Sequence, residues 1–239
     1  MISQKDLLFA FKDQNAQDIF TANNWSGALW DERTDSQSTI SDYLGLSEAN
    51  LGENNANYFV SRSVSKKTVV ASDGTVSSRL QIAFKNSSSK KGEDYKNYLE
   101  IILPQNASLN SILVNNKEVT VDKAVTDYFV YESRGFTPPS GVEVNQTIEM
   151  GKSVFGLLLN IPPGQVETIA LDYNLGDNIK SPQSGYNYSL KVYKQPGVDS
   201  YPFDLSFDLP DGYRVIQGSP TFSTDVNEDF EVNSQISQK

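Results

Sequence analysis

The chain has 239 residues, with 20 Lys and Arg against 30 Asp and Glu, a formal net charge of −10, and neither histidine nor cysteine. These absences exclude Ser-His-Asp and Cys-His catalysis, disulfides and the usual zinc sites, and they leave carboxylates, Lys, Tyr, Ser and Thr, or an oxygen-ligated metal such as calcium, for any chemistry. The acid surplus argues against a nucleic-acid partner, because phosphate binding needs a basic face.

Helical spacing is confined to the start of the chain. Apolar residues within 7–11 recur at helical spacing, and Asp13 resembles the N-cap of a second short helix that ends near Asn23. Residues 31–41 are polar and predict an exposed loop. Because two short helices cannot form a domain alone, we expect the 1–50 segment to pack on something else.

From Asn57 onward apolar and polar residues alternate, which predicts β-strands. The Asp73-Gly74 pair predicts a type I′ hairpin turn, because both residues tolerate positive φ. A spacing of roughly 8–12 residues between strands is typical of a β-sandwich. The expected strands cover 58–64, 79–86, 98–103, 109–114, 118–121, 127–132, 142–150, 153–161, 166–173, 186–193, 203–209 and 213–216.

These patterns predict a mainly β protein: an antiparallel, immunoglobulin-like β-sandwich, a smaller β region and a short helical N-terminal segment. We divide the chain into the helical segment at 1–50, the sandwich at 51–178 and the smaller β region at 179–239. About sixty residues are few for a complete sandwich. The alternative is therefore that 179–239 shares strands with the first region and forms one elongated unit with it.

The most distinctive stretch of the chain is Tyr43–Tyr58, YLGLSEANLGENNANY. Together with shorter motifs at spaced points along most of the chain, it resembles the bacterial domain of unknown function 4012 family. The shorter motifs are Leu7–Asp13, Gln17, Asn24–Gly27, Tyr98-Leu99 with Pro104, Val154–Gly156, Pro162–Gly164 and Lys194–Gly197.

The resemblance implies a cell-envelope protein with an N-terminal membrane helix, an α/β region somewhat similar to LytR-CpsA-Psr glycopolymer transferases, and β-rich C-terminal domains. This chain then corresponds to the C-terminal part, with 1–50 as the tail of an α/β domain that this sequence lacks. The resemblance places it outside the cytoplasm at the cell surface, tethered to the membrane only through the missing anchor. It also implies cell-wall glycopolymer or envelope proteins as partners.

A group of aromatic residues is the candidate binding site. Tyr128, Phe129, Tyr131 and Phe136, beside Arg134, place aromatic rings on both faces of one short predicted strand. Exposed rings can stack on the apolar faces of sugars, so these five residues are candidates for carbohydrate binding. The alternative is that the rings fill the sandwich core or a domain junction.

The Asn-rich segment Asn50–Tyr58 allows two interpretations. Asn and Gly suit a loop that needs left-handed backbone and hydrogen bonds from side chain to backbone. We interpret the segment as a structural joint between the helical tail and the first β-domain. The alternative is a ligand-binding loop at that junction.

Clustered acids raise the question of a metal or a hydrolase. The acids at 225–231 carry oxygen ligands that calcium takes, but they lack the spacing of a calcium loop, so we interpret them as a solvated terminus. The segment 172–177, DYNLGD, is interpreted as an ordinary loop. A glycosidase needs two carboxylates that flank the sugar bond, and the sequence cannot pair them. We expect no metal, no cofactor and no catalytic residue.

The sequence therefore predicts a non-enzymatic, extracytoplasmic β-sandwich module that acts as a spacer or interaction domain of a membrane-anchored envelope protein. The alternative is a carbohydrate-binding module for cell-wall glycopolymer. A carboxylate-dependent hydrolase is a weaker alternative.

Overall fold

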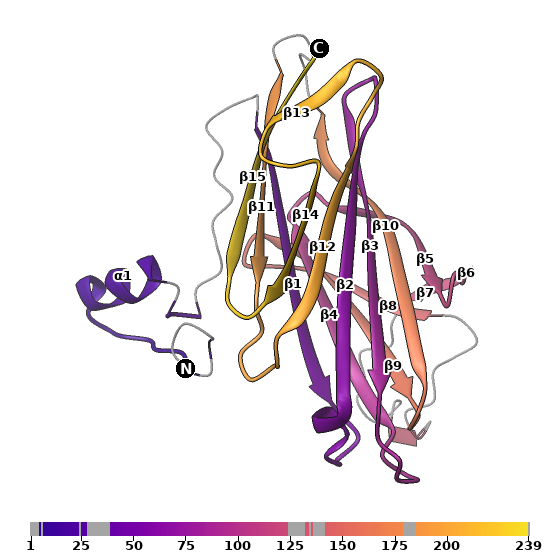
Figure 1. Cartoon of the computed structure of the whole chain (residues 1–239). Coiled ribbons are helices and arrows are strands. Elements are labelled where there is room, and N and C mark those ends of the chain that lie inside the picture. Colours follow the sequence, from indigo (N-terminus) through magenta and orange to yellow (C-terminus); the bar gives the residue numbers. More distant parts are fainter. Residues whose placement is uncertain are drawn as a thin grey trace.

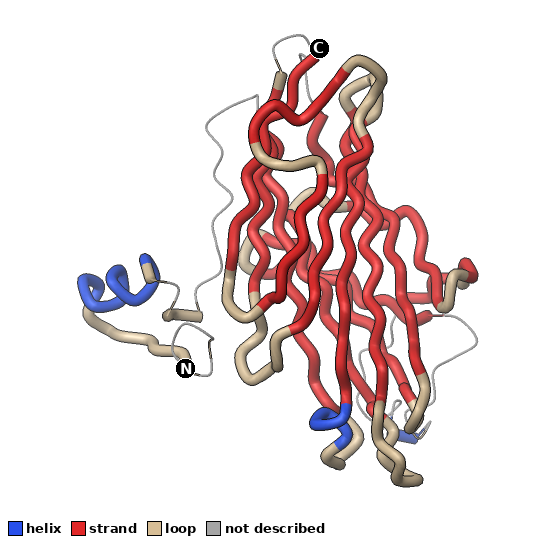
Figure 2. The backbone as a smooth tube through the Cα atoms, viewed as in Figure 1, coloured by secondary structure: helices blue, strands red, loops and turns tan. Residues whose placement is uncertain are grey.

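The computed structural model describes residues 5, 7–23, 25–27, 39–123, 132–133, 135, 142–178 and 185–238. The protein is mainly β, as predicted, and its strands form two sheets that face each other as a β-sandwich (Figures 1 and 2). The single α-helix of the described part, α1 (Gln14–Ala22), lies to one side of the sandwich (Figure 1).

Each sheet collects strands from distant parts of the chain. In spatial order, sheet A consists of β13 (Tyr213–Gln217), β15 (Phe230–Gln238), β11 (Tyr186–Tyr193), β1 (Thr39–Asn50), β4 (Tyr95–Pro104), β9 (Lys152–Ile161), β8 (Val142–Glu149) and β7 (Val121–Lys123). Sheet B consists of β14 (Thr221–Val226), β12 (Tyr201–Asp208), β2 (Val60–Val70), β3 (Thr75–Asn86), β10 (Val166–Asn178), β5 (Ser108–Val114) and β6 (Lys117–Glu118). Strands from the predicted 179–239 region thus extend both sheets.

The sheets are mixed, whereas the sequence predicted that the first sandwich is antiparallel. Most neighbours are antiparallel, but β1 with β11, β2 with β12 and β7 with β8 are parallel. Parallel neighbours need a long crossover connection, and a run of alternating residues carries no record of strand direction. Pattern alone therefore could not distinguish the two arrangements.

The alternation of apolar and polar residues places the core on one face of each half-buried strand. In β3, Leu80, Ile82 and Phe84 are fully buried on one face while the residues between them are partly exposed. Tyr186 and Tyr188 of β11 are also buried. One continuous apolar cluster joins the inner faces of both sheets.

The hairpin between β2 and β3 has a different turn from the predicted one. The N–H of Gly74 donates to the carbonyl of Ala71, and only Gly74 has positive φ in this loop. This is a three-residue loop in which a type I turn is followed by a left-handed glycine. The type I′ prediction was wrong because Asp73 does not adopt positive φ.

The N-terminal segment has one of its two predicted helices. Asp13 caps α1, accepting a hydrogen bond from the N–H of Ala16 at 2.9 Å, and the helix ends at Asn23, as expected. Residues 7–11 are not helical, since the N–H of Phe9 instead donates to the carbonyl of Trp25. In the described part of the chain, no helix is long and apolar enough to cross a bilayer.

Three strands lie where none was predicted. β1 occupies the end of the supposed helical segment 1–50, and it is buried on both faces along most of its length. Strands covered on both faces lose the alternation by which a half-buried strand is recognised. β14 and β15 cover the acidic stretch that was interpreted as a solvated terminus, and each pairs with an inner neighbour.

Candidate functional site

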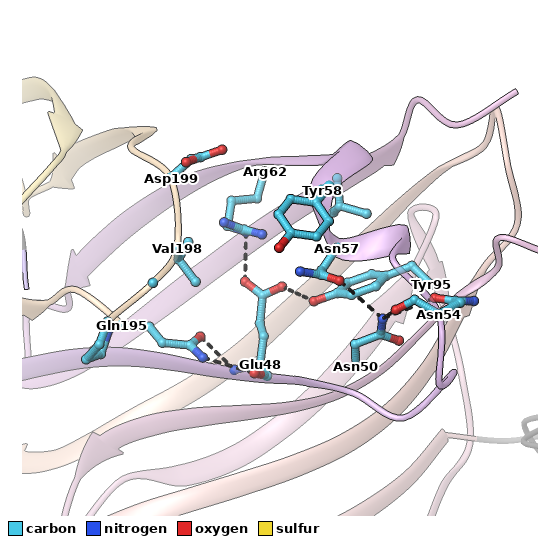
Figure 3. Close-up of a pocket in the computed structure, with 13 residues that line it drawn as sticks. Glu48, Asn50, Asn54, Asn57, Tyr58, Arg62, Tyr95, Gln195, Val198 and Asp199 are labelled. Atoms are coloured by element: carbon cyan, nitrogen blue, oxygen red, sulfur yellow. Dashed lines mark hydrogen bonds and ion pairs between the residues drawn. The ribbon is translucent and has the colours of Figure 1, made fainter. Parts of the chain in front are cut away.

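A pocket of about 400 Å³ lies at one end of the sandwich, where the β1–β2 junction meets the loop after β11 (Figure 3). Its walls come from the end of β1, the 3₁₀ turn η1 (Ala56–Phe59), the starts of β2 and β4, and residues 195–199. Two of the distinctive sequence motifs, Asn50–Tyr58 and Lys194–Gly197, therefore converge on this pocket.

The junction loop is held by its own asparagines. The Asn50 side chain donates to the carbonyl of Asn54 at 2.9 Å and accepts from the N–H of Gly52 at 3.0 Å. Asn54 in turn donates to the carbonyl of Asp94 at 2.9 Å and accepts from the N–H of Ala56 at 3.0 Å. These amides fix the loop against β4, which supports the structural interpretation of the motif.

A buried ion pair forms the floor of the pocket. Glu48 on β1 and Arg62 on β2 pair across the two sheets, with 2.7 Å between Glu48 Oε1 and Arg62 Nε and side chains only 4% and 7% exposed. The hydroxyl of Tyr95 on β4 donates to the other carboxylate oxygen of Glu48 at 2.7 Å. Both oxygens of Glu48 are thus engaged from opposite sides.

Burial perturbs the titration of both acids in this group. It raises the pKa of Glu48 above its ordinary value, although Arg62 and the Tyr95 hydrogen bond act in the opposite direction. Burial also raises the pKa of Tyr95, and the adjacent Glu48 carboxylate raises it further. Tyr95 therefore stays a hydrogen-bond donor to Glu48 at physiological pH.

Gln195 attaches the opposite wall to β1. Its side-chain carbonyl accepts from the N–H of Glu48 at 2.8 Å, and its side-chain amide donates to the carbonyl of Glu48 at 2.9 Å. These two hydrogen bonds replace the backbone hydrogen bonds that a neighbouring strand would make near the end of β1. It fixes the distance between the 195–199 loop and the junction loop, and so the width of the pocket.

Several polar and aromatic groups remain open to the pocket (Figure 3). Tyr58 is 80% exposed, and Asn57 and Asp199 are also exposed on the rim. Arg62 pairs only through Nε, so its two terminal nitrogens have no partner among the residues that the structure describes. The pocket therefore offers an aromatic ring, hydrogen-bond donors and an acceptor to a ligand.

A second buried polar cluster lies deeper between the sheets. Lys66 on β2 pairs with Asp42 on β1 at 2.9 Å, and both side chains are fully buried. Lys66 also donates to the hydroxyls of Tyr173 and Ser78 at 2.6 and 2.7 Å, and Tyr188 donates to Asp42 at 2.5 Å.

The ionised form of Lys66 is stabilised where it lies. Burial lowers its pKa more than any other single influence, but Asp42 and Tyr173 together outweigh it and leave the pKa above its ordinary value. Burial raises the pKa of Tyr173 and of Tyr188. None of these residues lines the pocket at the β1–β2 junction.

The sequence-predicted aromatic site, Tyr128, Phe129, Tyr131, Arg134 and Phe136, lies outside the described residues. The structure therefore does not test it.

The acids of 225–231 are placed by β14 and β15. Asp229 pairs with Lys5 at 2.6 Å and accepts from the N–H of Lys194, and Glu231 accepts from Ser189. No group of three or more acidic side chains that could hold a metal ion occurs within the described ranges.

Of the two acids in 172–177, Asp172 pairs with Arg79 at 3.2 Å and accepts from Ser111. The side chain of Asp177 lies outside the described residues.

No protein-family model and no curated protein matches the chain. Among solved structures it is similar to a nutrient binding protein from Legionella pneumophila, with 12% identity, 83% of this chain and 66% of that chain covered, and a TM-score of 0.31. It is also similar to an M1 zinc metallopeptidase from Deinococcus radiodurans, with 10% identity, 75% and 39% covered, and a TM-score of 0.31. Leukotriene A4 hydrolase from Saccharomyces cerevisiae gives 9% identity, 77% and 31% covered, and a TM-score of 0.40. The chain spans less than two thirds of each of these structures, and at these scores the likeness carries no information on function.

Proposed function

We propose that this chain is a non-enzymatic interaction module that binds carbohydrate at the pocket between the β1–β2 junction and the 195–199 loop. We further propose that it belongs to a membrane-anchored bacterial envelope protein and meets cell-wall glycopolymer outside the cytoplasm. The resemblance of Tyr43–Tyr58 and the spaced motifs supports the envelope setting. The composition of the pocket supports the ligand class.

The main support for a carbohydrate ligand is an exposed aromatic ring that lies beside fixed polar groups. Tyr58 presents its ring to solvent at the pocket, and an exposed ring can cover the apolar face of a pyranose. Sugar hydroxyls both donate and accept hydrogen bonds, so they fit a rim that carries the amide of Asn57 and the carboxylate of Asp199. The Asn50 and Asn54 hydrogen bonds hold this wall in place before a ligand arrives.

The state of Glu48 supports binding over hydrolysis. A glycoside hydrolase of the common kind needs two cleft carboxylates with oxygens free to reach the substrate. Both oxygens of Glu48 are engaged, by Arg62 and by Tyr95, while Asp199 is exposed on the rim. The pocket thus holds its buried carboxylate in a structural role.

The test is a titration of the protein with soluble cell-wall oligosaccharides, followed by calorimetry or by NMR shifts. We expect millimolar or tighter binding that Tyr58→Ala weakens roughly tenfold, which takes for a sugar the lower end of the about 1–3 kcal/mol that a base contributes when it stacks on an aromatic side chain. Tyr58→Phe keeps the ring and should bind almost as well as the wild type. Tyr131→Ala should leave binding unchanged.

Two outcomes would contradict the proposal. Absence of binding at millimolar oligosaccharide would leave the spacer role as the remaining explanation. Loss of binding in Tyr131→Ala, with Tyr58→Ala unaffected, would move the site to the aromatic group of residues 128–136.

A further inference from the structure

Arg62 is a buried cation with an unused recognition surface. Its side chain is only 7% exposed, and it lines the pocket. Its one partner among the described residues is Glu48, which it meets through Nε at 2.7 Å. The outer edge of the guanidinium, with its two terminal nitrogens, therefore has no protein acceptor within the described chain.

Neighbouring residues hold the guanidinium in this orientation. Tyr95 donates to Glu48 at 2.7 Å from the far side, so the carboxylate cannot turn away from Arg62. Gln195 ties the backbone of Glu48 to the opposite wall by two hydrogen bonds. Arg62 is thus positioned before binding, which lowers the entropic cost of using it.

The unused edge matches an oxyanion better than a neutral hydroxyl. Two parallel N–H groups of a guanidinium fit two oxygens of a carboxylate or a phosphate, and such charge-assisted pairs are the strong hydrogen bonds of proteins. A sugar hydroxyl supplies one oxygen and leaves the second donor without a partner. A hydrogen-bond donor in a mostly buried site costs free energy when it has no acceptor.

The charges around the pocket determine how much more tightly an anionic ligand binds than a neutral one. Glu48 already balances the charge of Arg62, so an anionic ligand gains from geometry and from short contacts more than from net attraction. Asp199 on the rim opposes an anion, but it is exposed, and its field is screened by salt. Removal of this carboxylate should therefore tighten the binding of an acidic ligand selectively, by a modest factor that is largest at low salt.

We propose that the pocket recognises an acidic substituent of a glycan, a carboxylate or a phosphate, through the two terminal nitrogens of Arg62. This inference rests on the proposed carbohydrate binding and names the class of sugar. Tyr58 stacks on the ring of the sugar, and Arg62 binds its oxyanion.

The experiment compares glucose, glucuronate, glucose 6-phosphate and acetate by NMR titration against the wild type and two variants. We expect one acidic sugar to bind at least roughly tenfold more tightly than glucose, since hydrogen bonds to a charged partner are stronger than those between neutral groups. Whichever of glucuronate and glucose 6-phosphate binds more tightly shows whether the pocket prefers a carboxylate or a phosphate. Arg62→Lys keeps the positive charge beside Glu48 but lacks the two parallel N–H groups of a guanidinium. It should reduce the preference for the acidic sugar over glucose to about threefold or less. Asp199→Asn, on the exposed rim, should raise the preference for acidic sugars over glucose, because it removes the carboxylate that repels an anion.

The outcomes separate the two proposals. Equal binding of glucose and both acidic sugars, still sensitive to Tyr58→Ala, overturns the role of Arg62 and leaves carbohydrate binding standing. Binding of acetate as tight as that of the acidic sugars overturns carbohydrate binding and leaves anion recognition by Arg62 standing. If Arg62→Lys fails to fold, an unchanged preference in Asp199→Asn overturns the inference on its own.

Discussion

The pair Asp42 and Lys66 shows how a charged residue is tolerated in a sandwich core. Lys66 uses three contacts, to Asp42, Tyr173 and Ser78, and Asp42 also accepts from Tyr188 and from the N–H of Tyr43. Every charge is therefore both paired and hydrogen-bonded, which is the condition for burial without a large penalty. Such a network is stable as a whole but sensitive to the loss of one member.

Removal of one charge from this pair should destabilise the protein strongly. We expect Lys66→Met to lower the free energy of unfolding by about 3–5 kcal/mol, because it leaves the Asp42 carboxylate buried without a counterion. The double variant Lys66→Met with Asp42→Asn should recover much of that loss, because neither charge remains. Urea unfolding of the two variants and of the wild type measures both effects. A double variant less stable than Lys66→Met would contradict this account.

At the residue scale the sequence revealed part of the candidate site. The motif Asn50–Tyr58 was recognisable as a loop that binds its own backbone, and a ligand-binding loop was the open alternative. Glu48 and Arg62 were not recognisable, because their pairing depends on β1 and β2 facing each other across two sheets. The sequence did offer one indication of Arg62. It lies on the same face of its strand as Val60 and Val64, so it is a charged residue at a core-facing position.

At the scale of elements, the β1–β2 junction acts as one hydrogen-bonded unit. Asn54 links this loop to the start of β4 and also orders the first turn of η1. Because Tyr58 lies in η1, the position of the proposed stacking ring depends on this asparagine. The loop is thus both a joint and a wall of the pocket.

Replacement of Asn54 should affect stability and binding together. We expect Asn54→Ala to lower the free energy of unfolding by about 1–3 kcal/mol, since it leaves the buried hydrogen-bond partners in the loop unsatisfied. Asn55→Ala is the matched control, because the Asn55 side chain makes no capping hydrogen bond to η1. Chemical denaturation and the glycan titration measure the two effects. Equal stability of both variants would show that the loop does not depend on its amide bonds.

The elements that the sequence predicted well were half-buried strands with a clear alternation, such as β3 and β11. β1 was missed because it is covered on both faces, so its residues do not alternate. β14 and β15 were missed because their acids, among them Asp225 and Glu231, suggested a free terminus. These side chains lie on exposed positions of the strands, which is compatible with pairing to β12 and β11.

At the scale of the whole molecule, buried and partly buried tyrosines set the pH above which the fold loses stability. Burial is the leading cause that raises the pKa of six of them, which are Tyr95, Tyr173, Tyr186, Tyr188, Tyr193 and Tyr201. In the unfolded chain these phenols ionise near pH 10, so above that pH the unfolded state holds fewer protons than the folded state. Their stabilising contribution is complete below pH 10 and is lost as the pH rises toward the folded values.

We therefore expect the free energy of unfolding to fall steadily between about pH 9.5 and 11.5. Lys66 acts in the same direction because its pKa is raised, whereas the lowered pKa of Lys5 opposes it and is outnumbered. Urea midpoints across this range give the slope, and absorbance of tyrosinate at 295 nm reports ionisation. Ionisation of the six phenols without unfolding, or a flat midpoint, would contradict the expectation.

The overall architecture was predictable to the level of a mainly β sandwich with a short helical start. The pairing of distant strands was not predictable in the same way, because alternation shows that a strand exists but not which strand it pairs with. The parallel pairs of β1 with β11 and β2 with β12 join residues 148 and 139 positions apart, for example Asp42 with Leu190 and Val64 with Phe203. Patterns of apolar and polar residues are read over short segments, so they cannot show contacts between residues this far apart in the sequence.

The same two parallel pairs have a consequence for how the chain folds. Until β11 and β12 are synthesised, β1 and β2 each have one open edge in the middle of the future sandwich. Open edges invite pairing with other chains, and distant contacts slow the search for the native state. A fragment that ends before residue 186 would carry both open edges permanently, so it should aggregate, and the intact chain should fold slowly and late in translation.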